Sequence, residues 1–129
     1  MTSDLDEIPV PPEPDYVAPD GSAVRLLCEV DAAGMAHFEL PSGSTTQAVV
    51  HKTVDEVWFV LSGHGWMWRR RDRDGVERET ELLPGLSLNL PVGTRFQFKA
   101  DGSESLAVIG VTVPRWPGPD EAVEVEGIW

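Results

Sequence analysis

The fold of this chain is decided by the stretch GSTTQAVVHKTVDEVWFVLSG, residues 43–63. Gly43 is followed by five residues and Val49, then by His51, by Glu56 after four more residues, and by Gly63 after a further six. Val49 and His51 are two residues apart, so they share one face of an extended strand. The stretch therefore predicts two short strands, bounded by glycine turns, that carry one histidine and one glutamate.

A second stretch, GLSLNLPVGTRFQFKA at residues 85–100, has a fixed spacing of its own. Five residues separate Gly85 from Pro91, one residue separates Pro91 from Gly93, and two residues separate Gly93 from Phe96. Together the two stretches resemble the paired motifs of the cupin superfamily, G(x)5HxH(x)3–4E(x)6G and G(x)5PxG(x)2H(x)3N. The glycines, the proline and all the spacings fit. The resemblance covers roughly residues 24–113 and implies a small jelly-roll barrel.

The metal ligands of typical cupins are only half present. In that family the two histidines and the glutamate of the first motif, with the histidine of the second, hold a divalent metal inside the barrel. The matching positions here are Val49, His51, Glu56 and Phe96, and Ala100 replaces the closing asparagine. Valine and phenylalanine have no lone pair to donate. The resemblance therefore implies a cupin that has lost its usual metal site, and we expect no cofactor.

The pattern of the whole chain predicts the same fold class without the family. Short apolar or alternating runs are separated by Gly, Pro, Asp and Ser, which is typical of an all-β sandwich or barrel. No window has a sustained 3.6-residue apolar period, so we expect little or no helix. Asp74-Gly75 is a strong hairpin signal. The expected strands are Val24–Val30, Ala36–Leu40, Gln47–His51, Val57–Leu61, Trp66–Arg70, Val76–Leu82, Ser87–Leu90, Arg95–Lys99 and Leu106–Val113.

The domain organisation that follows is a single cupin jelly-roll β-barrel with extended N- and C-terminal arms. Residues 1–22 are acidic and proline-rich, which favours an extended arm without a core. Residues 23–113 form the barrel. Residues 114–129 form a second arm, which includes Trp116 and Trp129. Because a tryptophan is costly to leave in water, we expect this arm to pack on the barrel or on a partner subunit, and we expect a homodimer.

Composition excludes several classes of partner. The chain of 129 residues has a formal net charge of −12, which repels nucleic acid and anionic membranes. No apolar stretch is long enough to span a membrane, and residues 1–7 lack the basic and apolar regions of a signal peptide. The single cysteine, Cys28, cannot form an internal disulfide, which favours a reducing compartment. We expect a cytoplasmic protein.

One basic run, Arg69-Arg70-Arg71-Asp72-Arg73, departs from this acidic composition. One interpretation is an anion-binding patch. The more ordinary interpretation is a solvated hairpin whose arginines face Glu77, Glu79 and Glu81 across the strands, where each exposed pair contributes only ~0.2–1 kcal/mol.

The resemblance places positions 49, 51, 56 and 96 in the barrel interior, so the candidate catalytic residues are His51 and Glu56. A carboxyl group in an aromatic pocket tends to have a raised pKa, and such a group can exchange protons near neutral pH. No metal ligand set is predicted, although His37, His64 or Gln47 could add a third ligand. The candidate substrate-binding residues are Val49, Trp58, Trp68, Phe96, Phe98, Phe38 and Gln47.

Three functions remain open from the sequence. The first, which we favour, is a metal-independent cupin enzyme that binds a small, largely apolar or aromatic molecule. It would act by acid–base chemistry of the isomerase, lyase or cyclase type. The second is a non-catalytic cupin that binds a small molecule, with His51 and Glu56 satisfying each other. The third is a metal-dependent cupin, a dioxygenase or a sugar isomerase, with an unusual ligand set.

Overall fold

The computed structural model describes residues 4–129, which contain eleven β-strands and no helix. Since no helix forms in these residues, none of them belongs to a helix that could cross a membrane. The strands are β1 (Tyr16–Val17), β2 (Ala23–Val30), β3 (Ala33–Leu40), β4 (Val49–His51), β5 (Asp55–Ser62), β6 (Gly65–Arg71), β7 (Glu77–Leu82), β8 (Ser87–Leu90), β9 (Thr94–Ala100), β10 (Leu106–Val113) and β11 (Ala122–Glu124).

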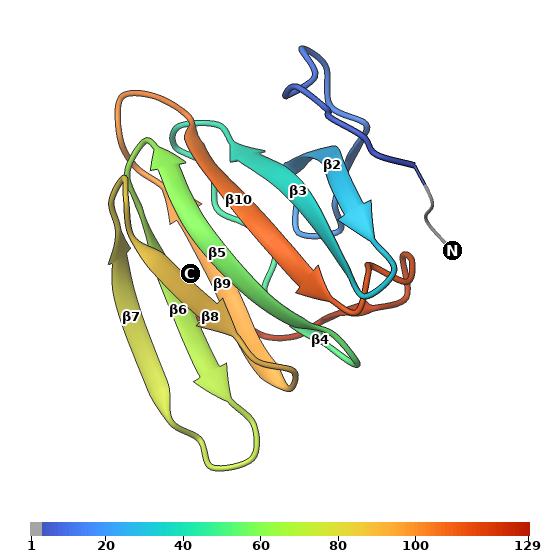
Figure 1. Cartoon of the computed structure of the whole chain (residues 1–129). Helices are drawn as coiled ribbons and strands as arrows, with labels where there is room; N and C mark the ends of the chain where they lie inside the picture. Colours follow the sequence, from blue (N-terminus) through green and yellow to red (C-terminus); the bar gives the residue numbers. More distant parts are fainter. Residues whose placement is uncertain (1–3) are drawn as a thin grey trace.

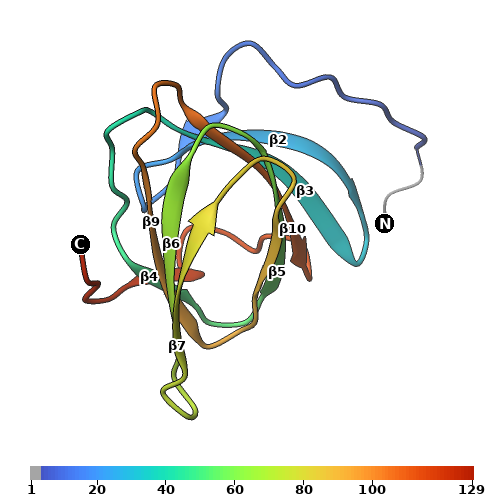
Figure 2. The same ribbon diagram turned by 90° about the vertical axis from the view of Figure 1, so that its left-hand side faces the viewer.

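The strands form two antiparallel sheets that face each other (Figure 1). The larger sheet has the order β1-β2-β3-β10-β5-β8, and the smaller has the order β11-β4-β9-β6-β7. Figure 2 looks between them, with β4, β6 and β9 on one side and β3, β5 and β10 on the other. The all-β jelly-roll architecture expected from the sequence is confirmed.

The core lies between the sheets because alternate residues of each strand point inward. In β5, Glu56, Trp58 and Val60 are buried and their neighbours are exposed. In β9, Phe96 and Phe98 face inward with Val49 of β4, which pairs with Phe96. Strand alternation and strand pairing thus bring both halves of the motif to one interior.

Two strands were not predicted, and both belong to the arms. β1 pairs with the start of β2 at the edge of the larger sheet, and β11 pairs with β4 at the edge of the smaller one. The arms therefore extend the sheets instead of only lying on them. The first three positions of the expected N-terminal arm lie outside the described residues.

The predicted hairpin at Asp74-Gly75 is confirmed, since β6 and β7 pair antiparallel and Gly75 adopts a φ of 71°.

The expected pairing of the basic run was wrong in part. Arg70 faces Glu77, but Arg69 stands opposite another arginine, Arg78. The cause is register, because Glu79 and Glu81 pair with Trp68 and Trp66 instead of with arginines.

Candidate functional site

A cavity of about 850 Å³ lies between the two sheets. The larger sheet contributes most of its wall from β2, β3, β5 and β10, and the smaller sheet contributes β4 and β9. The N-terminal arm and residues 116–119 complete the wall. Most of the lining side chains are apolar, and the residues important here are Tyr16, Asp20, Phe38, His51, Glu56, Trp58, Phe96, Gly110, Thr112 and Trp116.

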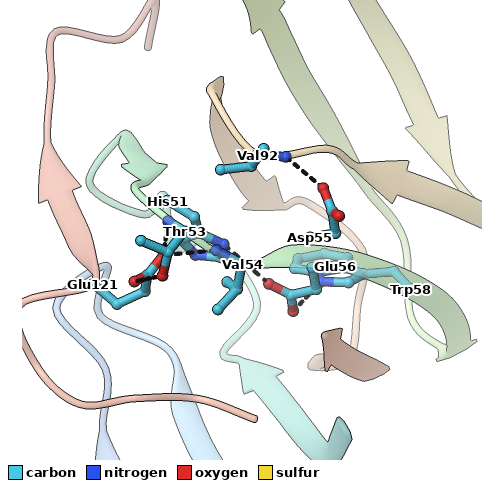
Figure 3. Close-up of polar contacts among 8 residues, drawn as sticks. All are labelled: His51, Thr53, Val54, Asp55, Glu56, Trp58, Val92 and Glu121. Atoms are coloured by element: carbon cyan, nitrogen blue, oxygen red, sulfur yellow. Dashed lines mark hydrogen bonds and ion pairs between the residues drawn. The ribbon is translucent and has the colours of Figure 1, made fainter. Parts of the chain in front are cut away.

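Glu56 is the buried carboxyl group of this cavity, with an exposed fraction of 4%. One carboxylate oxygen, Oε2, accepts a hydrogen bond of 2.7 Å from the indole Nε1 of Trp58 (Figure 3). Burial disfavours the charged form and raises the pKa of Glu56 to about 7, although the Trp58 hydrogen bond acts in the opposite direction. Asp20 adds a smaller upward effect. Glu56 therefore exchanges a proton close to neutral pH.

His51 faces Glu56 from the other sheet. Its Nδ1 lies 3.5 Å from Oε1 of Glu56, and this nitrogen has no closer hydrogen-bond partner in residues 4–129. Burial lowers the pKa of His51 to about 4, so the ring is uncharged at neutral pH. With these two pKa values the pair holds one titratable proton, on Glu56, between about pH 4 and pH 7, and Glu56 is half protonated at about pH 7.

Aromatic rings surround this pair. The ring of Phe96 meets His51 edge-on with centroids 5.2 Å apart, and Trp116 meets His51 edge-on at 5.0 Å. Phe38 stacks on Trp58 at 5.9 Å. These rings keep water from the pair, and this exclusion is the physical origin of both pKa shifts.

Gly110 of β10 allows the wall to close on Glu56. A Cβ atom at this position would lie 2.5 Å from Cε2 of Phe38 and 2.6 Å from Oε2 of Glu56. No side chain larger than hydrogen fits without moving one of them. Glycine at position 110 therefore leaves the space that the Glu56 carboxyl group and the Phe38 ring occupy.

Four of the candidate substrate-binding residues do not line the cavity. Val49 and Phe98 are buried in the core, and Phe98 supports Trp58 from behind at a centroid distance of 4.9 Å. Trp68 pairs with Gln97 on the opposite face of the smaller sheet from Met67 and Phe98. Gln47 is exposed and donates to the carbonyl oxygen of Val125. Trp68 and Gln47 thus lie outside the barrel interior.

The sequence analysis did not single out several lining residues, among them Gly110 and Thr112 of β10 and three residues of the arms, Tyr16, Asp20 and Trp116. Burial raises the pKa of Asp20, whose carboxylate accepts hydrogen bonds from the hydroxyl and the N–H of Ser22. Burial also raises the pKa of Tyr16, as do nearby carboxylates that include Glu56. Trp116 covers His51. Among these arm residues only Trp116 gave a signal in the sequence, because a tryptophan is costly to leave in water.

Glu121, in the C-terminal arm, fixes the short turn that joins His51 to Glu56. Its carboxylate accepts hydrogen bonds of 2.6 Å from both the N–H and the hydroxyl of Thr53, and one of 3.0 Å from the N–H of Val54 (Figure 3). Desolvation acts to raise the pKa of Glu121, but these hydrogen bonds lower it. Glu121 is therefore a buried anion that anchors the turn.

The donors present do not fit the metal of typical cupins. Val49 and Phe96 stand at two of the four ligand positions, and both are buried apolar side chains. His51 and Glu56 remain as donors. Within residues 4–129 no three side chains of His, Cys, Asp or Glu are grouped so that they could hold a metal ion. A tight site generally needs at least three protein ligands, so His51 and Glu56 alone do not make one.

No protein-family model matches the sequence, and no curated protein matches it. Solved structures do match. The capsular polysaccharide assembling protein CapF from Staphylococcus aureus is 19% identical with a TM-score of 0.71; the match covers 82% of this chain and 32% of CapF. This chain therefore spans about a third of CapF.

Two further solved structures are similar to this chain. The cupin domain of Schizosaccharomyces pombe Cnp3 is 13% identical with a TM-score of 0.64, over 72% of this chain and 61% of that one. A protein from Klebsiella pneumoniae with a double-stranded β-helix domain is 17% identical with a TM-score of 0.65, over 82% and 85%. The expected fold is confirmed: the chain has the double-stranded β-helix fold that these cupin structures share.

Proposed function

We propose that this protein is a metal-independent cupin enzyme that acts on a small, largely apolar molecule by acid–base chemistry. One observation carries the proposal. Within the 850 Å³ cavity, the buried carboxyl group of Glu56 lies 3.5 Å from the uncharged ring of His51. A titratable pair in an apolar pocket, with strongly shifted pKa values, is a marker of functional sites.

The substrate class follows from the lining. Cavities that bind small molecules have volumes of about 300–1,000 Å³, so this one has room for a ligand with several rings or a chain. Phe38, Trp58, Phe96 and Trp116 offer flat apolar surfaces. Tyr16, Asp20 and Thr112 offer a few polar atoms that would orient the ligand. A sugar would need more hydroxyl-binding groups than these, so we favour an apolar or aromatic substrate.

Proton transfer by Glu56 is the reaction that this site supports. With a pKa near 7, the carboxylate form removes a proton from one atom of the substrate, and the resulting carboxyl group returns it to another. Atoms and charge balance in such an isomerisation without any further reactant. A protonated Oε1 would be 3.5 Å from Nδ1 of neutral His51, and a small approach of the two side chains would let it donate a hydrogen bond that orients the carboxyl group.

The decisive experiment identifies the ligand first. Freshly purified protein is denatured, and the small molecules released are compared by mass spectrometry with those released from a Trp58→Ala variant. We expect an apolar molecule that is depleted in the variant. Incubation of that molecule with the protein should then yield an isomer, a dehydrated product or a cyclised product.

A non-catalytic binding protein is the second candidate, and the hydrogen bond from Trp58 to Glu56 favours it. This bond satisfies one carboxylate oxygen inside the protein, as expected of a purely structural pair. If the released ligand is bound but never converted, and Glu56→Gln leaves its affinity unchanged, the protein is a non-catalytic binding protein.

A further inference from the structure

A second pocket, of about 130 Å³, lies apart from the cavity described above and shares no lining residue with it. It is formed where β6, β7 and β9 of the smaller sheet approach the end of β8. Its lining residues are Arg69, Arg71, Val76, Arg78, Asn89, Pro91 and Thr94. In a chain of net charge −12, a pocket with three arginines and no carboxylate in its lining is unexpected.

The arginines reach this pocket because of strand alternation. Arg69 pairs with Phe96, and Arg71 pairs with Thr94, so these side chains share the inward face of the smaller sheet. Arg69 spans to the other sheet, where its Nη1 donates to the backbone oxygen of Asn89 at 2.9 Å. The guanidinium is thus held in place between the sheets.

Of the three arginines in this pocket, only Arg71 has its charge compensated by a carboxylate of residues 4–129. The carboxylate of Asp74 lies 2.7 Å from Nη2 of Arg71 and neutralises that residue. Arg69 and Arg78 have no carboxylate partner in residues 4–129. They also stand directly opposite each other on β6 and β7. Like charges in directly opposed positions destabilise a sheet. Desolvation and the charge of Arg78 both lower the pKa of Arg69, yet an arginine keeps its proton at neutral pH.

Two hydrogen-bonding groups at the pocket are also without a partner. The Nε of Arg69 and the Oγ1 of Thr94 are buried and bond to no other atom of the described chain. Thr94 is 5% exposed, so its hydroxyl does not reach bulk water freely. Buried polar groups are nearly always paired, and an unpaired one indicates a missing ligand or water. Here the unpaired groups lie in the same lining as the uncompensated charges.

We propose that this pocket binds a small tetrahedral oxyanion, either free phosphate or the phosphoryl group of a metabolite. A dianion between Arg69 and Arg78 offsets their mutual repulsion and accepts charge-assisted hydrogen bonds from both guanidinium groups. Arg69 would donate through its unpaired Nε, since its Nη1 and Nη2 already donate to Asn89 and Thr80, and the Thr94 hydroxyl supplies one further donor. The volume of about 130 Å³ admits an oxyanion and little else, so the rest of a metabolite would project out of the pocket.

Binding of inorganic phosphate is the test. Phosphate and sulfate are titrated against the full chain at constant ionic strength, with chloride as the reference ion, and binding is measured by calorimetry and by the shift of Tm. We expect phosphate to bind and to raise Tm, while chloride does not. Because charges further than about 8 Å apart are screened at 0.15 M salt, the net charge of the chain does not prevent this.

Matched variants locate the site. Arg78→Gln and Thr94→Val should weaken phosphate binding by about tenfold and about fivefold, the usual effects of losing a charged and a neutral hydrogen bond. Arg73→Gln removes the same charge from a side chain that is 77% exposed and outside the pocket, and it should leave binding unchanged. Glu56→Gln should also leave it unchanged, since Glu56 lies in the other cavity.

The outcomes separate the possible ligands. Tighter binding of ribose 5-phosphate than of inorganic phosphate would identify a phosphorylated metabolite, and equal affinities would identify the free ion. The proposal is overturned if wild-type protein binds neither at millimolar concentration. It is equally overturned if Arg73→Gln weakens binding as much as Arg78→Gln does, because the effect would then come from general charge.

Discussion

The Nδ1 atom of His51 and the Oε1 atom of Glu56 lie 3.5 Å apart, although the two residues belong to different sheets. A turn of three residues joins β4, which ends at His51, to β5, in which Glu56 is the second residue, so the chain passes from the smaller sheet to the larger between the two residues of the pair. The pair spans the space between the sheets at the wall of the cavity. Its protonation state is therefore sensitive to anything that changes the hydration of the interior.

Glu56→Gln should lower turnover of the identified substrate by about 10²–10⁴-fold, the usual effect of losing a general acid or base. Glutamine keeps the volume of the side chain and can still accept the hydrogen bond from Trp58, but it cannot exchange a proton. Ligand affinity should change far less, because the aromatic walls contribute most of it. Steady-state kinetics and calorimetry on the same preparation measure both. Full turnover in the variant would exclude Glu56 as the catalyst.

The same substitution should change the dependence of stability on pH. The pKa of Glu56 is raised from 4.5 to about 7 in the folded protein, so its contribution to stability is present below pH 4.5 and is lost as the pH rises to 7. At 1.36 kcal/mol per pKa unit, this shift changes the free energy of unfolding by about 3 kcal/mol. Relative to wild type, Glu56→Gln should gain stability between pH 4.5 and 7 in denaturant titrations. No relative gain would mean that Glu56 titrates normally.

His51→Gln should change the pH dependence of stability in the opposite direction to Glu56→Gln. The pKa of His51 is lowered from 6.5 to about 4, so its contribution is present above pH 6.5 and is lost as the pH falls to 4. Relative to wild type, the variant should therefore lose stability as the pH rises from 4 to 6.5. In the wild type the two trends nearly cancel over this range, because folding moves one proton from the histidine to the carboxyl group. Parallel curves for wild type and variant would contradict this account.

Gly110→Ala should impair the site without removing either titratable group of the acid–base pair. The new methyl group would displace Phe38 or Glu56, and overpacking of this kind costs about 1–3 kcal/mol. We expect lower thermal stability and lower turnover. Gly34→Ala on the adjacent strand is the control, since its nearest neighbour would be 3.7 Å away. Equal losses in both variants would show that the effect is one of strand propensity alone.

Purified protein should carry no stoichiometric transition metal, which elemental analysis measures. Val49→His combined with Phe96→His should create metal affinity, because it places two imidazole rings beside His51 and Glu56 on paired positions of β4 and β9. Calorimetry with Zn²⁺ or Ni²⁺ should detect binding, and addition of His51→Ala to the double variant should abolish it. No gain in affinity would mean that these four positions do not converge.

A homodimer remains a prediction, and the outer face of β5 is the surface we expect it to use. Val57, Phe59 and Leu61 are 52%, 47% and 43% exposed on consecutive outward positions, and they carry no charge that would oppose a second copy of this acidic chain. Phe59→Lys should shift the mass from light scattering toward 14.2 kDa, while Leu83→Lys at an exposed turn should not. A 14.2 kDa wild-type species at micromolar concentration would exclude the dimer.

The strands of the barrel could be predicted because each is long enough to show alternation and ends at a turn residue. Ser87–Leu90 and Leu106–Val113 were placed at the bounds that the structure shows. β1 and β11 are only two and three residues long and lie among prolines. They are strands only because β1 pairs with β2 and β11 pairs with β4. The local sequence does not show with which strand so short a segment will pair.

The same distinction explains which site residues could be predicted. His51, Glu56, Trp58 and Phe96 lie in strands whose alternation fixes the inward face. Trp68 follows the Gly63–Gly65 turn, which leaves the face undetermined in the sequence, and the structure places it outward. Gln47 precedes the first residue of β4, so the alternation that relates it to Val49 does not apply. Asp20 and Trp116 reach the cavity through the folding of the arms, which only the tertiary structure reveals.

The residue that anchors the turn before Glu56, Glu121, belongs to the same segment as the residue that covers His51. Trp116, which covers His51, and Glu121, which holds Thr53 and Val54, are five residues apart in one segment. One short segment therefore both covers the His51 ring and holds the backbone that leads from His51 to Glu56. The cover over the pair and the anchor of its geometry are parts of the same stretch of chain.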